Sequence, residues 1–204
     1  MDLRSIDAVL FDMDGTLVDS DAAVERAWMT WAAEYGVDPA AVLAIAHGSP
    51  ADRTVRRIRP DLDEEQVAAA STRQLDLQYD DLSDVVATPG AHELIAALAE
   101  AGVPWAVVTS ADVRLAEARL GAAGIDAPLL VTVEDIEHGK PAPDGYLRAA
   151  ELLGVDPVRC LVVEDAEPGV VSGRAAGATV AALRGLDADV RITTLYELLP
   201  TAHE

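Results

Sequence analysis

The chain has 204 residues, of which 50% are hydrophobic and only 4% aromatic, so we expect a sizeable core built mainly from Ala, Val and Leu. Its formal net charge of −21 argues against nucleic acid and anionic membrane surfaces as partners, because like charges repel. The single cysteine, Cys160, excludes an internal disulfide and fits a reducing compartment. With no signal-peptide pattern and no apolar run near 18 residues, we expect a cytoplasmic protein.

Five short apolar runs recur along the chain, and none shows the polar alternation of a half-exposed sheet. We predict strands buried on both faces at 8–11, 104–109, 128–133, 160–164 and 178–183. Helical patterns lie between them, at 90–102, 111–124, 142–154 and 166–177. This alternation predicts βαβ units, and therefore an α/β fold with a Rossmann-like, doubly wound parallel sheet.

One long section interrupts the alternation just after the first predicted strand. From about Asp19 to Val86 the sequence carries only helical patterns, and we expect Trp28 and Trp31 to form the core of this insert. We therefore predict an α/β core made of residues 1–18 and 87–204 and an all-helical cap at 19–86. The hinges of the cap are expected near 18–21 and 85–89.

Polar side chains follow the predicted strands at the edge where an open parallel sheet binds its ligands. They are Asp12, Asp14, Thr109, Ser110, Lys140, Glu164 and Asp165. Lys140 stands out because it is the only lysine among 15 basic residues. A compact ammonium can neutralise a carboxylate and a phosphate together, which a guanidinium fork would not reproduce. We therefore interpret Lys140 as a functional residue.

The carboxylates at this edge need a counter-charge, and a hard divalent cation prefers oxygen ligands. Mg²⁺ typically takes one or two protein carboxylates, several waters and a substrate phosphate. A Ca²⁺ loop of the EF-hand type is a poorer match, because its glycine comes two residues later than Gly15 does after Asp12. We predict a Mg²⁺ site whose candidate residues are Asp12, Asp14, Glu164 and Asp165.

Four segments, DMDGT, VVTS, GKPAP and VVEDAEPGV, stand in the order and spacing of the haloacid dehalogenase-like hydrolase superfamily. The chain resembles that family over nearly its whole length, and the helical insert is similar to the family's small cap. The segments HGSPADRTVRRI and WAVVTSAD most resemble the branch of sugar phosphatases and glycerol phosphate phosphatases. The resemblance implies a Mg²⁺-dependent phosphatase that hydrolyses small phosphomonoesters, such as sugar or polyol phosphates, through an aspartyl-phosphate.

The resemblance also implies a role for each carboxylate. Asp12 would attack phosphorus as the nucleophile. Asp14 would protonate the leaving alkoxide and then act as the base for water. Asp12, the backbone carbonyl of Asp14 and Asp165 would hold Mg²⁺, with Glu164 nearby through water or behind the ligands.

Other residues would hold the phosphate and select the substrate. The resemblance places Thr109, the Ser110 amide and Lys140 on the phosphoryl oxygens. The cap would close over the site and contact the leaving group. Its candidate contacts are His47, Ser49 and Arg53.

Several alternatives stay open or are disfavoured by particular residues. Asp14 argues against dehalogenase chemistry, and the lack of a lysine in the cap argues against phosphonatases. A phosphosugar mutase of the β-phosphoglucomutase type is disfavoured, because those enzymes carry a cap histidine where this chain has Val24. A phosphoglycolate-type phosphatase is a further alternative, and a non-enzymatic phospho-ligand-binding protein is a rival that the intact acidic set opposes. We expect a small phosphorylated metabolite as partner, and a monomer with a dimer as the alternative.

Overall fold

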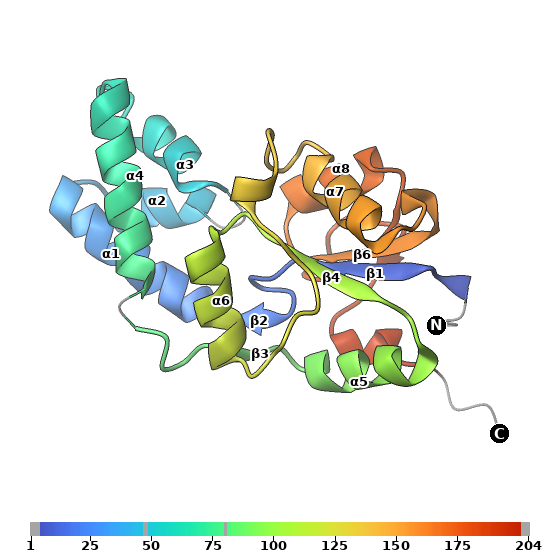
Figure 1. The fold of residues 1–204 in the computed structure, drawn as a ribbon. Helices are drawn as coiled ribbons and strands as arrows, with labels where there is room; N and C mark the ends of the chain where they lie inside the picture. Colours follow the sequence, from blue (N-terminus) through green and yellow to red (C-terminus); the bar gives the residue numbers. More distant parts are fainter. Residues whose placement is uncertain (1–4, 47–48, 80, 201–204) are drawn as a thin grey trace.

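The computed structural model describes residues 5–46, 49–79 and 81–200. Its centre is a sheet of six parallel strands in the order β5-β4-β1-β6-β7-β8 (Figure 1). The strands are β1 (Ala8–Phe11), β4 (Trp105–Val108), β5 (Leu130–Val131), β6 (Cys160–Glu164), β7 (Thr179–Ala182) and β8 (Val190–Arg191). The predicted α/β fold with a doubly wound parallel sheet is therefore confirmed.

The central strands β1, β4 and β6 are apolar up to their carboxyl ends because helices cover both faces of the sheet. In β1, Val9 and Phe11 pack in the cluster that contains the apolar faces of α5 and α6, whereas Ala8 and Leu10 pack with those of α7 and α8. The helices are α5 (Ala91–Ala101), α6 (Val113–Ala122), α7 (Asp144–Leu153) and α8 (Glu167–Ala175). Alternate strand residues thus supply two cores, one on each face.

The prediction of a strand over 128–133 is wrong in its extent. Only Leu130–Val131 pairs with β4, and Val133–Asp135 forms a 3₁₀ turn, η2. Thr132 ends the strand, because its side chain accepts from the Glu134 amide while Asp135 accepts from the Thr132 amide. The sequence reading also missed β8, whose two residues are too few to show a pattern.

Four helices form the cap between β2 (Val18–Asp19) and β3 (Val86–Ala87), which pair as a short antiparallel ribbon. The helices are α1 (Asp21–Tyr35), α2 (Pro39–Ala46), α3 (Ala51–Ile58) and α4 (Glu64–Tyr79). As expected, Trp28 and Trp31 lie in a separate cap core, where the Trp31 indole nitrogen donates to the carbonyl of Ala70 at 2.9 Å. The cap therefore has a hydrophobic core of its own.

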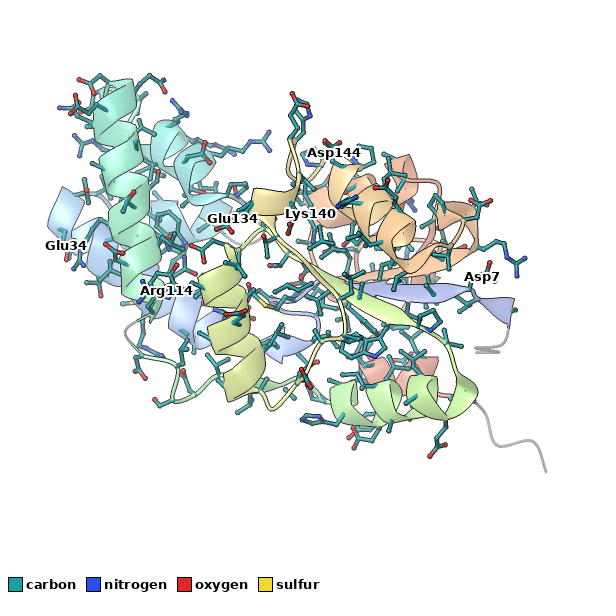
Figure 2. The ribbon with its side chains drawn as sticks, viewed as in Figure 1. Asp7, Glu34, Arg114, Glu134, Lys140 and Asp144 are labelled. Atoms are coloured by element: carbon teal, nitrogen blue, oxygen red, sulfur yellow. The ribbon has the colours of Figure 1, made fainter. Side chains whose placement is uncertain are left out.

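The cap lies beside the edge of the sheet where the strands end (Figure 1). Helix α4 of the cap meets α6 of the core, and the Tyr79 hydroxyl donates to Asp112 at 2.6 Å there. Figure 2 shows Lys140 near the middle of the molecule, between cap and core, while Asp7 and Glu34 lie at its periphery. Within the described ranges, no helix combines the length and apolar character needed to cross a membrane.

Candidate active site

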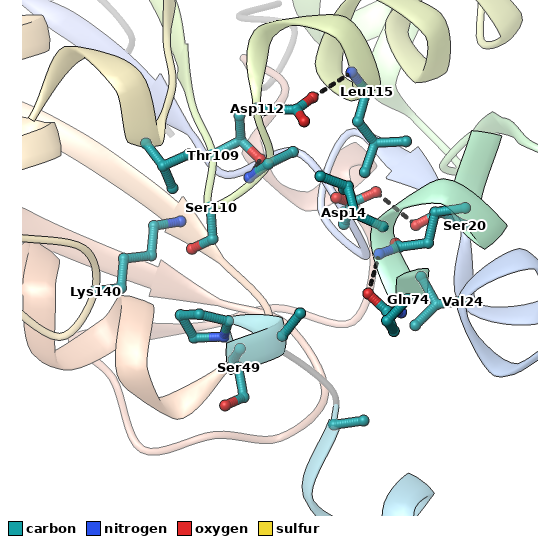
Figure 3. Close-up of a pocket in the computed structure, with 18 of the residues that line it drawn as sticks. Asp14, Ser20, Val24, Ser49, Gln74, Thr109, Ser110, Asp112, Leu115 and Lys140 are labelled. Carbon is teal, nitrogen blue, oxygen red and sulfur yellow. Dashed lines mark hydrogen bonds between the residues drawn. The ribbon is translucent and has the colours of Figure 1, made fainter. Parts of the chain in front are cut away.

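The seven polar residues predicted at the strand ends come together in the structure. A cavity of about 450 Å³ lies between the strand ends and the cap (Figure 3). Its core-side lining includes Asp12, Asp14, Thr109, Ser110, Lys140, Glu164 and Asp165. Residues from four separate parts of the sequence therefore share one site, as expected where a parallel sheet presents the carboxyl ends of its strands.

Lys140 is the cation at the centre of this site. Its ammonium donates to Asp12 Oδ1 at 2.5 Å, to Glu164 Oε1 at 2.7 Å and to the carbonyl of Val108 at 3.1 Å. These contacts use all three of its N–H groups. Burial opposes the charged form, but the carboxylates of Asp12 and Glu164 outweigh it and raise the pKa of Lys140. Lys140 is therefore a permanent positive charge.

The buried carboxylate of Glu164 fixes the position of the Lys140 ammonium. Its Oε1 also accepts from the Tyr146 hydroxyl at 2.7 Å, and its Oε2 accepts from the amides of Asp165 and Ala166. Gly169 makes room for this carboxylate, since a Cβ there would lie 1.7 Å from Glu164 Oε1. Glu164 is 1% exposed and has both oxygens engaged, so the geometry places it behind the site.

Asp12, Glu164 and Asp165 form an acidic cluster in which one oxygen of each carboxylate lies within 4.8 Å of the others. Burial and the charge of Glu164 raise the pKa of Asp12 well above its ordinary value, although Lys140 lowers it. Burial and Glu164 also raise the pKa of Asp165 to about 7, against the opposing effect of Arg184, which contacts Asp165 at 2.9 Å. The Lys140 ammonium and the Arg184 guanidinium, which is shared with Asp21, do not offset three carboxylates. The cluster could hold a metal ion, which would supply the missing positive charge.

Asp14 stands apart from the acidic cluster. Its Oδ2 pairs with the Arg119 guanidinium at 2.7 Å, and its Oδ1 accepts from the Ser20 hydroxyl at 2.6 Å. Both side-chain oxygens of Asp14 are thus engaged by Arg119 and Ser20, and the metal role predicted for its backbone carbonyl stays a prediction. Gly15 permits the backbone turn that follows Asp14, with φ of +82° and no room for a Cβ, which would lie 2.1 Å from Asp165 Oδ2.

The residues predicted to hold phosphate stand at the end of β4. Thr109 is buried, and its Oγ1 accepts from the Ala111 amide at 3.1 Å, which leaves the hydroxyl hydrogen for another acceptor. Ser110 is half-buried and lines the cavity beside Lys140 (Figure 3). The phosphate-binding roles of Thr109 and Ser110 stay predictions, and the position of both residues on the cavity is compatible with them.

The cap residues predicted to contact substrate differ in their position relative to the cavity. Ser49 lines the cavity, and so does Val24. Arg53 is exposed and is not among the residues that line this cavity, so its role as a contact stays a prediction without support from its position. His47 lies outside the described residues.

The sequence reading missed several residues that hold the site together. They are Tyr146 behind Glu164, Arg119 beside Asp14, Arg184 beside Asp165, and Gln74 and Gln78 on the cap side. All but Arg184 lie within helices, where a polar residue has no spacing that distinguishes it from a solvent-facing one. Arg119 and Tyr146 are each at most 2% exposed, and only the folded structure reveals this burial.

Comparison with known proteins identifies the family. The family model described as a haloacid dehalogenase-like hydrolase matches residues 6–177. The chain is 47% identical over 175 residues to hexitol phosphatase A of Escherichia coli, an alignment that covers 85% of this chain and 81% of that protein. It is 35% identical over 193 residues to 2-deoxyglucose-6-phosphate phosphatase 1 of Saccharomyces cerevisiae, covering 85% of this chain and 78% of that protein.

A solved structure of similar shape is a haloacid dehalogenase hydrolase, family IA, variant 3, from Entamoeba histolytica. It superposes with a TM-score of 0.84 at 24% identity, covering 94% of this chain and 95% of that one, and it bears on the fold alone. The curated relatives confirm the predicted reaction class, a phosphatase of small phosphomonoesters. The chain belongs to the haloacid dehalogenase-like hydrolases.

Proposed function

We propose that this protein is a Mg²⁺-dependent phosphatase of sugar or polyol phosphates that works through a phosphorylated Asp12. The observation that carries the proposal is the separation of the two carboxylates of DMDGT. Asp12 pairs with Lys140 at 2.5 Å in the acidic cluster, whereas Asp14 pairs at 2.7 Å with Arg119 of α6, which also contacts the cap helix α4 in the same cavity. One carboxylate is thus placed for phosphorus and the other for the leaving group.

In the first chemical step, Asp12 acts as the nucleophile and Asp14 as the acid. Lys140 holds Oδ1 of Asp12, so Oδ2 attacks phosphorus and forms the acyl-phosphate bond while the bond from phosphorus to the leaving oxygen breaks. Protonated Asp14 gives its proton to that leaving oxygen, so the product departs as an alcohol. Lys140 offsets negative charge on the phosphoryl oxygens during transfer.

The second step returns the enzyme to its starting state. Asp14, now a carboxylate, accepts a proton from a water that attacks the phosphorus of phospho-Asp12. Phosphate leaves, and the Asp12 carboxylate is restored. Arg119 and Ser20 keep the Asp14 side chain in place through both steps, because together they bind both of its oxygens in the resting protein.

The acidic cluster supports a divalent cation at this site. Asp12, Asp165 and the carbonyl of Asp14 would hold Mg²⁺, while Glu164 is already engaged by Lys140, Tyr146 and two amides. When bound, the ion would offset the negative charge of the phosphoryl group and of the crowded carboxylates.

Hydrolysis is favoured over a mutase reaction by the cap side of the cavity. Val24 lines the cavity where the resemblance would place a mutase's histidine, and an apolar side chain gives no base to activate a sugar hydroxyl. Water is then the acceptor of the phosphoryl group.

Phosphate release from a panel of phosphomonoesters tests the proposal. The panel includes hexitol, hexose and glycerol phosphates, a two-carbon acid phosphate and p-nitrophenyl phosphate, each with Mg²⁺ and with EDTA. We expect Mg²⁺-dependent release that is fastest for a sugar or polyol phosphate. No release from any member would overturn the enzyme assignment, and conversion of glucose 1-phosphate to an isomer without free phosphate would favour the mutase.

A further inference from the structure

One buried donor on the cap side of the cavity has no partner. Gln74, on α4, is 0% exposed and lines the cavity, and its Nε2 forms no hydrogen bond with any described residue. A buried N–H without an acceptor costs free energy, so native proteins usually avoid it. An unmet donor on a side chain that lines a cavity indicates a ligand acceptor.

The neighbouring side chains determine which atom of the Gln74 amide is left without a partner. Arg119 donates to Gln78 Oε1 at 2.6 Å, and a guanidinium has no acceptor, so the amide oxygen of Gln78 must face it. The Gln78 Nε2 is therefore left to donate to Gln74 Oε1 at 2.8 Å. The Gln74 oxygen is occupied as a result, and its nitrogen is the atom left over.

This chain of hydrogen bonds starts at Asp14. Arg119 donates one N–H to Asp14 and another to Gln78, while its Nε, also buried, has no partner in the described part of the chain. The carboxylate thus orients a guanidinium and two amides in sequence, and the series leaves an unpartnered donor on each of two side chains that line the cavity, Arg119 and Gln74. Figure 3 shows Gln74 across the cavity from Lys140, near Val24 and Ser20.

The charge of the cavity decides which acceptor fits. Among the described residues that line it, Arg119 and Lys140 are the cations, and both already pair with carboxylates. Its acidic residues are Asp12, Asp14, Asp21, Asp52, Asp112, Glu164 and Asp165. A leaving group with its own carboxylate or second phosphate would be repelled, whereas a neutral hydroxyl oxygen accepts from an amide without adding charge.

We infer that Gln74 is a specificity-determining residue that donates from Nε2 to a hydroxyl oxygen of a neutral, polyhydroxylated leaving group. The apolar side chains of Val24, Trp28 and Leu75 line the same side and pack against the carbon skeleton of that group. This inference rests on the proposed phosphatase function and adds to it how the cap distinguishes a polyol phosphate from other phosphomonoesters.

The test compares two substrates in two variants. Gln74→Leu removes the donor, and Gln74→Glu keeps an acceptor for Gln78 while replacing the donor with an oxygen. We expect each variant to lower kcat/KM for a hexitol phosphate by roughly tenfold or more, because a site built around a hydroxyl loses most when its partner is missing. The kcat/KM for n-hexyl phosphate, whose alcohol leaving group needs the same acid assistance but carries no further hydroxyls, should change by less than about threefold.

Gln66→Leu is the matched control, since Gln66 lies on the same helix but is exposed and outside the cavity. This substitution should leave kcat/KM unchanged for both substrates. Equal losses on both substrates in the Gln74 variants, or no loss on either, would overturn the inference while the phosphatase function stands. Wild-type preference for a carboxylated phosphate would overturn it too. If the wild-type protein hydrolyses neither substrate, the proposed function itself fails.

Discussion

The two sides of the cavity differ in how their polar groups are bonded. At the sheet edge, Lys140 and Glu164 have every strong donor and acceptor engaged within the protein. Where the cap helix α4 meets α6 of the core, Gln74 and Arg119 each keep a buried donor without a partner among the described residues. The fully hydrogen-bonded groups at the sheet edge hold Asp12 in a fixed position, whereas the unpartnered donors of Gln74 and Arg119 remain for a ligand. The attack on phosphorus and the recognition of the substrate therefore depend on different residues.

Exchanging each carboxylate of the DMDGT segment gives the largest expected effect. Asp12→Asn removes the nucleophile, so kcat should fall by about four orders of magnitude or more with every substrate. Asp14→Asn removes the acid, so the loss should be about a hundredfold or more for a hexitol phosphate but only about tenfold in the transfer step for p-nitrophenyl phosphate. Single-turnover release of nitrophenol measures that step. Equal, complete loss for both variants with the aryl ester would contradict the division of labour.

Substituting two glycines tests whether the sheet edge is as rigid as its saturated bonding indicates. In Gly169→Ala the new Cβ overlaps Glu164, so the carboxylate must leave Lys140 and Tyr146. We expect kcat to fall about a hundredfold and the free energy of unfolding to fall by about 2 kcal/mol, as measured by urea titration.

Gly121→Ala is the control for this substitution. It lies in α6 with no atom within 4 Å of the new Cβ, so it should leave kcat unchanged and stabilise the protein by about 0.5–1 kcal/mol. Normal activity in Gly169→Ala would show that the sheet edge tolerates displacement of Glu164.

Metal binding should give a smaller effect that depends on pH. Burial and Glu164 raise the pKa of Asp165 to about 7. A carboxyl whose pKa is raised by folding stabilises the protein fully below its unfolded value of about 4, and this contribution is lost as pH rises through 7. Repulsion between the ionised carboxylates therefore destabilises the metal-free protein more at pH 8 than at pH 6. Mg²⁺ should raise Tm by about 3 °C or more at pH 8 and by less at pH 6.

Differential scanning fluorimetry with Mg²⁺ and with EDTA measures this difference. Ca²⁺ and Na⁺ at matched ionic strength serve as controls for general screening. A Mg²⁺ shift that is the same at both pH values, or larger at pH 6, would contradict a cation bound by the crowded carboxylates.

The sheet edge could be predicted from sequence because its residues follow apolar runs directly. Asp12 and Glu164 stand at or beside strand ends, and Lys140 is conspicuous as the only lysine. Parallel topology then brings such residues together whatever their separation in the chain. The extent of β5 was harder, because Thr132 belongs to a turn that its own side chain caps.

The region where α4 of the cap meets α6 of the core could not be predicted in the same way. Gln74, Gln78 and Arg119 lie on helices whose tertiary packing decides which face is buried, and their residue types are common on exposed faces. The direction of each amide follows from contacts between two domains far apart in sequence. Arg53 illustrates the difficulty, since its type suited substrate binding but its side chain is exposed.

Mass spectrometry of the Asp14→Asn variant, quenched during turnover of p-nitrophenyl phosphate, tests the central claim most directly. This variant can still transfer the phosphoryl group but lacks the base for water, so phosphate should accumulate on the peptide that contains Asp12. The same peptide from an Asp12→Asn, Asp14→Asn double variant should carry none. A phosphoryl group on another residue, or release of nitrophenol by the double variant at the rate of Asp14→Asn, would contradict the assignment of Asp12 as nucleophile.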